Sequence, residues 1–454
     1  MKRWSFTLLF VALTPIFVSC GDDDDENKKE EPATCDVVAQ TGCEDGQVCE
    51  TVAGAEPKCF APVSVKGKVF DTTTQAGIEG AHVVARDANE GAVSGIAVSA
   101  KDGTYELRVP SPRDADGKPV KTEYTLRADA MGYLTFPKAP RVALPVDIAT
   151  ATGDPLVVQS SATDIGLIPL PSTANLGSVS GKVLADSPGG TLVVAGGVTG
   201  TAGTDGAYTV FNVPAGSVGV SGYLAGVNLK PATAEVKAGA TTSDVNLDVL
   251  GKATTTVSGK VEIVNPGLGK NTSVILVVEE TFVANAARGE APPGLRAANV
   301  SGEWSIPNVP DGKYVVLGAF ENDFLVRDPD TSIGGTEIQH ITVPGTSTVS
   351  SFKITGALAV ISPDGGKEVS GTPTFTWEDD SSEDSYTVQV YDAFGTEVWK
   401  QEGVIGPKGS KPAELAYAGP QMKSGLYYQF RATSIKGGVP ISRTEDLKGV
   451  FLYK

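Results

Sequence analysis

The stretch Val179-Ser180-Gly181-Lys182-Val183, followed by Asp205-Gly206-Ala207-Tyr208-Thr209-Val210, holds the pattern that decides the fold of this chain. Apolar residues at alternate positions, such as Tyr208 and Val210, place their side chains on one face of a β-strand. The Asp-Gly pair directly before this strand supplies a tight turn. The pattern therefore predicts a small antiparallel β-sandwich.

Both phrases occur in three copies along the chain, which indicates tandem units. In the first copy we expect strands near residues 64–70, 104–109 and 124–129. The second and third copies also share an Asn-Val-Pro-x-Gly phrase, at 212–216 and 308–312, where Pro-x-Gly turns the chain into its next strand. The other copies of the two main phrases are Val65-Lys66-Gly67-Lys68-Val69, Val257-Ser258-Gly259-Lys260-Val261, Asp102-Gly103-Thr104-Tyr105-Glu106-Leu107 and Ser301-Gly302-Glu303-Trp304-Ser305-Ile306.

These phrases resemble the carboxypeptidase regulatory-like family, a transthyretin-like seven-stranded sandwich. The family's late Gly-Tyr pair is matched by Gly132-Tyr133, more weakly by Gly222-Tyr223, and not at all in the third copy. The resemblance covers residues 63–355 and implies three sandwiches, at 63–172, 173–252 and 253–355. In that family the catalytic carboxypeptidase is a separate domain, and nothing in this chain resembles it.

The last part of the chain, residues 356–454, follows a different pattern. Alternation in Pro373-Thr374-Phe375-Thr376-Trp377 and in Tyr386-Thr387-Val388-Gln389-Val390-Tyr391 predicts strands. This part resembles a fibronectin type III domain, which implies that Trp377 is its core tryptophan and Tyr428 its tyrosine corner. The alternative is that Trp377 and Tyr428 are exposed ligand platforms.

Composition agrees with an all-β fold class. The 454 residues include 53 Gly and 29 Pro, spread along the chain, and this profile favours short strands between frequent turns. We therefore expect tandem antiparallel β-sandwich domains after a small disulfide-rich module and a disordered tether. The net charge is −17 and no basic run is present, which argues against nucleic acid as a partner.

The N-terminus is typical of an exported protein. Lys2 and Arg3 precede an apolar stretch, Phe6–Val18, that is too short for a comfortable membrane span. The junction Phe17-Val18-Ser19-Cys20-Gly21 resembles a bacterial lipobox, which implies a signal peptide at 1–19 and lipid on Cys20. An uncleaved anchor and a plain signal peptide are the alternatives.

An acidic segment follows the lipidation site. Residues 21–34 contain seven acidic residues against Lys28 and Lys29, a composition typical of a solvated, disordered tether over 20–34. The acidic run from Asp22 resembles the export tags of surface lipoproteins. We therefore expect the lipid anchor to insert into a membrane, and the acidic run favours the outer membrane. Either leaflet of that membrane is compatible with the sequence.

Four further cysteines, Cys35, Cys43, Cys49 and Cys59, crowd into a module at 35–62, and the chain beyond has none. An even cluster in an exported chain predicts disulfides that staple a domain too small to hold a core. Without a CxxC pair, a structural zinc site is the weaker alternative. The three possible pairings stay open at this stage.

Residue types needed for catalysis are sparse. His82 and His340 are the two histidines; they lie in different repeats and are expected to be surface or edge residues. The chain contains no HExxH, GxSxG or P-loop motif. Asp379, Asp380, Glu383 and Asp384 cluster in an expected loop, where solvated charge is the main interpretation and calcium binding the alternative. We predict no catalytic residue, no metal and no cofactor.

Two classes of function remain. The first is a non-catalytic cell-envelope lipoprotein that acts as a spacer or a protein-interaction scaffold, with an unknown envelope protein as partner. Short sandwiches in a row also predict that the chain from about residue 61 onward is an elongated rod. The second is a carbohydrate-binding surface lipoprotein, in which exposed Trp304, Trp399 or Tyr133 would stack on a glycan. An enzyme is the third and weakest class.

Overall fold

The computed structural model describes residues 35–37, 40–87, 91–138, 143–264, 272–284, 289–321, 327–329, 338–355, 357–380, 382–407, 411–444 and 448–454. The predicted signal peptide, the tether and Cys20 lie outside these residues. The described chain is all-β, as the repeats predict, with two single-turn 3-10 helices at Ile148–Thr150 and Glu279–Thr281. None of its helices has the length and apolar character that a membrane span requires.

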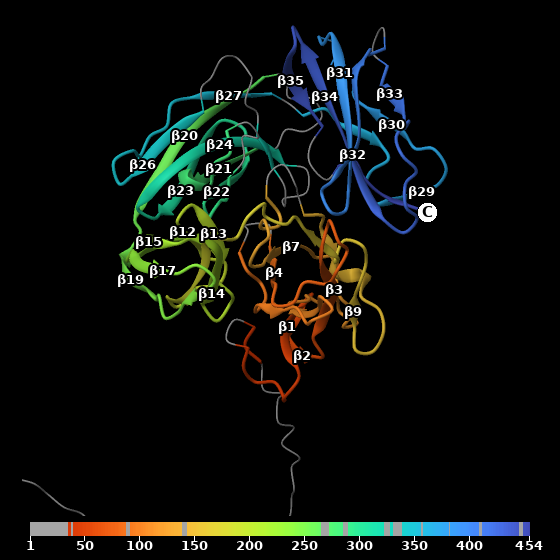
Figure 1. The fold of residues 1–454 in the computed structure, drawn as a ribbon. Coiled ribbons are helices and arrows are strands. Elements are labelled where there is room, and N and C mark those ends of the chain that lie inside the picture. Colours follow the sequence, from red (N-terminus) through yellow and green to blue (C-terminus); the bar gives the residue numbers. More distant parts are fainter. Residues whose placement is uncertain are drawn as a thin grey trace, which may run out of the picture.

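A hairpin and a first sandwich come first in the chain (Figure 1). The hairpin pairs β1 (Val48–Val52) with β2 (Ala55–Phe60). In the sandwich, a sheet of order β10-β3-β6, with β9 also on β3, faces a sheet of order β5-β4-β7-β8. Its strands are β3 (Val63–Asp71), β4 (His82–Arg86), β5 (Ala97–Val98), β6 (Thr104–Val109), β7 (Glu123–Asp129), β8 (Val146–Asp147), β9 (Val157–Val158) and β10 (Ile165–Leu167).

The second sandwich is one continuous sheet that closes around its own core. Its order is β13-β12-β15-β16-β19-β11-β14, with β17 on β15 and β18 on β11. Its strands are β11 (Leu176–Leu184), β12 (Leu192–Ala195), β13 (Val198–Thr201), β14 (Ala207–Pro214), β15 (Gly216–Leu224), β16 (Val227–Leu229), β17 (Ala232–Val236), β18 (Thr241–Thr242) and β19 (Leu247–Lys252).

The third sandwich has two sheets, of order β23-β20-β27 and β22-β21-β24-β25, with β26 on β24. Its strands are β20 (Thr255–Val264), β21 (Thr272–Val278), β22 (Arg296–Val300), β23 (Glu303–Val309), β24 (Gly312–Glu321), β25 (Arg327–Pro329), β26 (Gln339–Val343) and β27 (Phe352–Thr355).

The fourth sandwich packs a sheet of order β28-β30-β33 against one of order β29-β36-β34-β31-β32, with β35 on β34. Trp377 is fully buried in its core beside Phe430, and Tyr428 is buried with its hydroxyl accepting from the amide of Lys423. Core packing is therefore confirmed for both. The strands are β28 (Val360–Ser362), β29 (Lys367–Val369), β30 (Thr374–Trp377), β31 (Ser385–Asp392), β32 (Glu397–Val404), β33 (Ala413–Ala416), β34 (Tyr427–Lys436), β35 (Val439–Arg443) and β36 (Val450–Tyr453).

The two recurring phrases prove to be neighbouring antiparallel strands. The glycine of the first phrase lies opposite the aromatic residue of the second in every copy, as Gly67–Tyr105, Gly181–Tyr208 and Gly259–Trp304. A side chain at these glycines would collide with backbone or with the aromatic ring. The glycine therefore makes room for the backbone of a neighbouring segment in the first two copies and for the indole ring in the third.

The ring also carries a hydrogen bond in two of the copies. Tyr105 donates from its hydroxyl to the carbonyl of Thr163 at 2.6 Å, and Tyr208 donates to the carbonyl of Val245. In the third copy Trp304 fills the same place, and its indole Nε1 has no hydrogen-bond partner among the described residues. In all three copies a large ring therefore lies opposite the glycine, whereas the hydrogen bond from the ring is formed in only two.

The Asn-Val-Pro-x-Gly phrase forms the same backbone irregularity twice. Asn212 and Asn308 adopt left-handed φ values of 62° and 58°, and the strand register slips at each of them. Asn tolerates this conformation better than most residues, and a β-bulge of this kind bends a strand. The next strand then begins at Gly216 or Gly312.

The sandwiches do not form the predicted elongated rod. They cluster, with the first and second below the third and fourth in the view of Figure 1. Leu192, Val194 and Tyr223 of the second sandwich belong to the core of the third. The fourth folds back on the first, where the rings of Phe70 and Phe394 pack edge to face at 5.0 Å. The rod prediction is wrong because the outer sheet faces are buried against neighbouring sandwiches.

Candidate functional site

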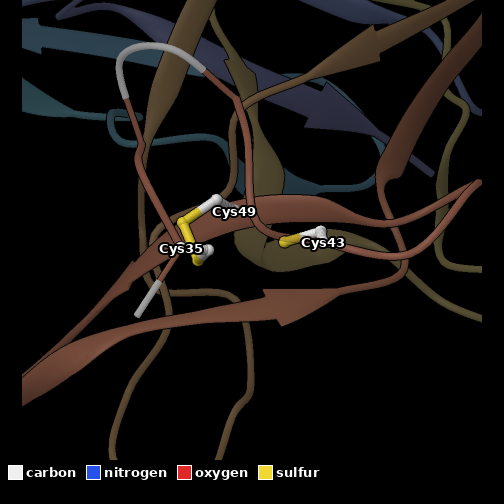
Figure 2. A group of neighbouring side chains, drawn as sticks. All are labelled: Cys35, Cys43 and Cys49. Atoms are coloured by element: carbon white, nitrogen blue, oxygen red, sulfur yellow. A yellow bond between two sulfur atoms is a disulfide. The ribbon is translucent and has the colours of Figure 1, made fainter. Parts of the chain in front are cut away.

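The cysteine module contains two disulfides, as predicted. Cys35 is bonded to Cys49 and Cys43 to Cys59, which settles the pairing that the sequence left open. The sulfurs of Cys35, Cys43 and Cys49 lie within 4.8 Å of one another, and Figure 2 shows Cys43 beside the Cys35–Cys49 bridge. Because all four sulfurs are committed to disulfides, this cluster offers no thiolate ligand to a metal.

The module is docked on the first sandwich through buried polar groups. Glu50 accepts a hydrogen bond from the amide of Ser111 at 2.8 Å, and Arg113 donates to the carbonyl of Ala61 at 3.0 Å. The Arg113 guanidinium also lies 4.8 Å from the centre of the Phe60 ring. Burial raises the pKa of Glu50, against the hydrogen bond from Ser111 and the charge of Arg113. The cysteine module is therefore folded together with the four sandwiches, and we call this whole part of the chain the head.

The two histidines stand in different surroundings. His340, on β26, is half exposed and lies 3.1 Å from the carboxylate of Glu279, as expected for a surface residue. His82 is on an inner strand, and its ring packs edge to face against Phe211 of the second sandwich at 4.9 Å. Burial lowers the pKa of His82. His82 is half-buried because the second sandwich covers part of its ring, so the prediction of a surface or edge residue holds for it only in part.

The acidic loop of the fourth sandwich is turned toward its own strands. Asp379 accepts from the Tyr386 hydroxyl at 2.8 Å, and Asp380 accepts from the Ser434 hydroxyl at 2.7 Å. Asp384 accepts from the amide of Gly437 at 2.6 Å. Burial, with Asp379 and Asp380 nearby, raises the pKa of Glu383. These contacts give three of the acids structural partners and leave no shared set of oxygens aimed at one point among the described residues.

Of the aromatic residues proposed as sugar platforms, one is buried and two are half-buried. Trp304 is 5% exposed and lies in the core of the third sandwich, so it cannot be an exposed platform. Trp399 is half-buried, with its ring edge to face against Tyr417 at 5.0 Å and the Gly419 turn against it. Tyr133 is half-buried and donates its hydroxyl to Asp71 at 3.1 Å. Packing against the fold explains each of these rings.

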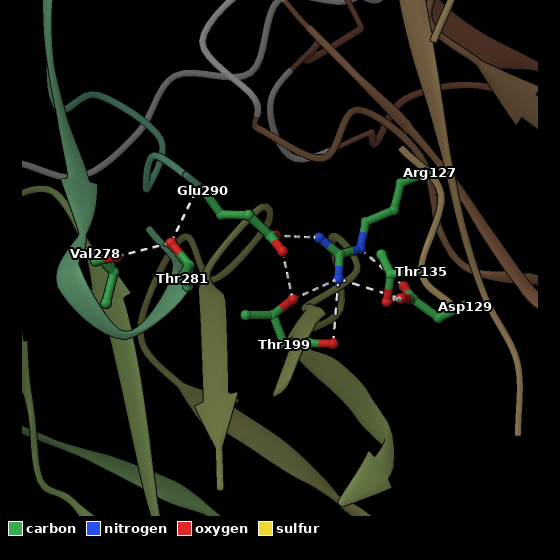
Figure 3. Close-up of polar contacts among 7 residues, drawn as sticks. All are labelled: Arg127, Asp129, Thr135, Thr199, Val278, Thr281 and Glu290. Atoms are coloured by element: carbon green, nitrogen blue, oxygen red, sulfur yellow. Dashed lines mark hydrogen bonds and ion pairs between the residues drawn. The ribbon is translucent and has the colours of Figure 1, made fainter. Parts of the chain in front are cut away.

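The sequence reasoning missed a buried polar junction centred on Arg127 (Figure 3). Arg127, on β7, is 1% exposed and donates from Nε to Asp129 at 2.8 Å. From the third sandwich, Glu290 forms an ion pair with the same guanidinium. From the second sandwich, Thr199 accepts from Nη2 through both its carbonyl and its hydroxyl oxygens, at 3.1 and 3.0 Å.

The junction is closed by further hydrogen bonds. Thr199 donates its hydroxyl to Glu290 at 2.6 Å, and Thr135 donates to Asp129 at 2.7 Å. The backbone amide of Glu290 donates to Thr281 at 2.8 Å, which fixes the glutamate to the third sandwich. Burial disfavours both charges, but the mutual attraction outweighs it, so the pKa of Arg127 is raised and that of Glu290 lowered. Both therefore remain charged at neutral pH.

Comparison with known proteins identifies no family. No family model matches the sequence, and no curated protein matches it. Similar structures include the Bacillus anthracis TIE protein, at 11% identity over 83% of this chain and 68% of that one, with a TM-score of 0.15. The major pilin subunit BcpA of Bacillus cereus is similar at 10% identity over 64% of this chain and 98% of that one, with a TM-score of 0.18. At these scores we draw no functional argument from either.

Proposed function

We propose that the chain is a non-catalytic, lipid-anchored cell-envelope protein whose sandwiches act together as a protein-interaction scaffold. One observation carries this proposal: the Arg127 junction draws groups from three sandwiches into one buried site. A buried ion pair is a costly way to gain stability, and its best-attested use is to specify one arrangement. A specified arrangement of several sandwiches serves a scaffold, because it holds binding surfaces in register for as long as the junction is formed. A simple spacer needs no such contact.

The anchor is the second part of the proposal. The junction at Val18-Ser19-Cys20-Gly21 supports lipidation at Cys20, and the acidic residues after it support the outer membrane. Each buried methylene adds about 0.8 kcal/mol, so several acyl chains would hold the head firmly at a membrane. Replacement of Cys20 by Ser is expected to release the protein from the membrane fraction of expressing cells. If the variant stays with the membranes as the parent does, the lipoprotein assignment fails.

The scaffold itself is tested by crosslinking in intact cells. A photoreactive residue at Glu402, on the exposed edge strand β32, should give discrete crosslinked bands, because exposed strands and loops are the common contact surfaces of β-scaffolds. The same residue at Phe430, which is fully buried, serves as the matched control. Turnover of peptides, esters or glycans that is lost in an Asp379→Asn variant would contradict the proposal, as would equal crosslinking at both positions.

A further inference from the structure

The contacts between sandwiches differ in chemistry. The second and third share an apolar cluster, and only Ala253 and Thr254 separate β19 from β20. Among the described residues, the first sandwich shares no apolar cluster with either of the other two. It meets them through the Arg127 junction, the Asn212 side chain and the ring contact of His82 with Phe211. Asn212 donates to the carbonyls of Ala130 and Tyr133 and accepts from the amide of Gly132.

The connections between the sandwiches differ as well. Eight residues, 168–175, join β10 to β11, so the first sandwich is tethered to the second by a longer segment. An apolar contact and a short connection together hold the second and third sandwiches as one unit. A polar contact and a longer connection allow the first to move as a body, because polar groups that separate can be hydrated.

The outer face of β4 and β7 shows what the closed arrangement covers. Most of its residues are buried although they point away from the core of the first sandwich, and His82 on the same face is half-buried. The buried ones are Val84, Arg86, Thr125, Arg127 and Asp129. When this face opens, Arg127 keeps Asp129, since both lie on β7. The contacts with Glu290 and Thr199 exist only in the closed form. In the open state Arg127 therefore still has a charged partner, Asp129. The closed state adds the contacts of Arg127 with Glu290 and Thr199.

We propose that the Arg127–Glu290–Thr199 junction is a latch between a closed and an open form of the head. Release of the latch separates the first sandwich from the unit formed by the second and third. A scaffold built in this way presents one compact surface when closed and gains reach when open. The inference rests on contacts between sandwiches and stands or falls apart from the lipid anchor and from any partner.

The test is small-angle scattering of the full exported chain, carrying Cys20→Ser so that no lipid micelle contributes. A compact chain of this length has a radius of gyration of about 22 Å. The parent should lie near this value, and Glu290→Gln should give a larger radius, because the first sandwich separates from the second and third while the fourth keeps its apolar contact with the first. Glu106→Gln is the matched control, because its ion pair with Lys66 is exposed and lies within the first sandwich.

Hydrogen exchange distinguishes opening of the latch from a general loosening of the fold in a variant. In Glu290→Gln, amides of β13 and β7 should exchange at least tenfold faster, while β21 keeps its protection. Asn212→Asp, which sets a carboxylate against two carbonyls, should act in the same direction. Loss of protection throughout β21 would mean that Glu290 only supports its own sandwich, and would overturn the latch. An unchanged radius and unchanged exchange in both variants would overturn it as well.

Discussion

Replacement of Gly181 by Ala tests the contact on which the repeat is built. A Cβ atom at this position would lie 2.0 Å from the carbonyl oxygen of Val245, where an ordinary contact is at least 3.4 Å. Backbone cannot rotate out of the way as the end of a side chain can. The segment at Val245 must therefore move away from β11, and it takes with it the hydrogen bonds from Tyr208 and to Ser180.

The magnitude follows from these two losses. Overpacking a close contact costs about 1–3 kcal/mol, and a buried carbonyl left without its donor costs about 1–3 kcal/mol. The second sandwich has roughly 80 residues, and at about 0.05–0.15 kcal/mol per residue its stability is roughly 4–12 kcal/mol. A loss of about 2–6 kcal/mol would remove a large part of this reserve.

Hydrogen exchange measures this loss one sandwich at a time, which a melting curve of a multi-domain chain does not. Peptides from β11 and β14 should lose protection in Gly181→Ala, and peptides of the fourth sandwich should not. Gly219→Ala is the control, because Gly219 lies in a strand of the same sandwich with open space around it. If both variants keep equal protection, the close approach at Gly181 does not hold this sandwich together.

Three further predictions concern the hydrogen bonds, the disulfides and the pH response. Tyr105→Phe should lower the stability of the first sandwich by about 1–3 kcal/mol, read from hydrogen exchange, because the carbonyl of Thr163 loses its donor. Peptide mapping without reductant should join Cys35 to Cys49 and Cys43 to Cys59, and reduction should add four hydrogens to the mass; free thiols or other pairs would contradict this. The closed form should lose stability as pH falls below 4.5, the usual pKa of Glu290, since its pKa in the closed form is lower still and protonation ends its attraction to Arg127 and Arg86. The nearby His82, whose pKa is lowered by burial, also responds to pH, so scattering should compare the parent with Glu290→Gln, which should lack the part of the acid response that comes from Glu290.

The strands could be predicted from the sequence because their signals are local. In the first copy the expected strands at 64–70, 104–109 and 124–129 match β3, β6 and β7 to within one residue at each end. Turn residues and alternation act between near neighbours, so a single segment contains the information. The disulfide module was predictable for the same reason, although the choice of pairs was not. Parallel partners such as β9 and β10 on β3 left no comparable local pattern.

The Arg127 junction could not be predicted from the sequence, because a polar strand face that is buried against another sandwich has the same residue pattern as one that faces water. Along β7, Leu126 and Ala128 alternate with Arg127 and Asp129, and this pattern is typical of a strand with one face in water. The polar face is instead buried, and its charges are satisfied by groups 72 and 163 residues further along the chain, at Thr199 and Glu290. A charge that is paired across domains has the same sequence signature as a solvated one. Only the positions of the sandwiches in space distinguish a paired charge from a solvated one. The function of the head must therefore be argued from how its sandwiches are arranged.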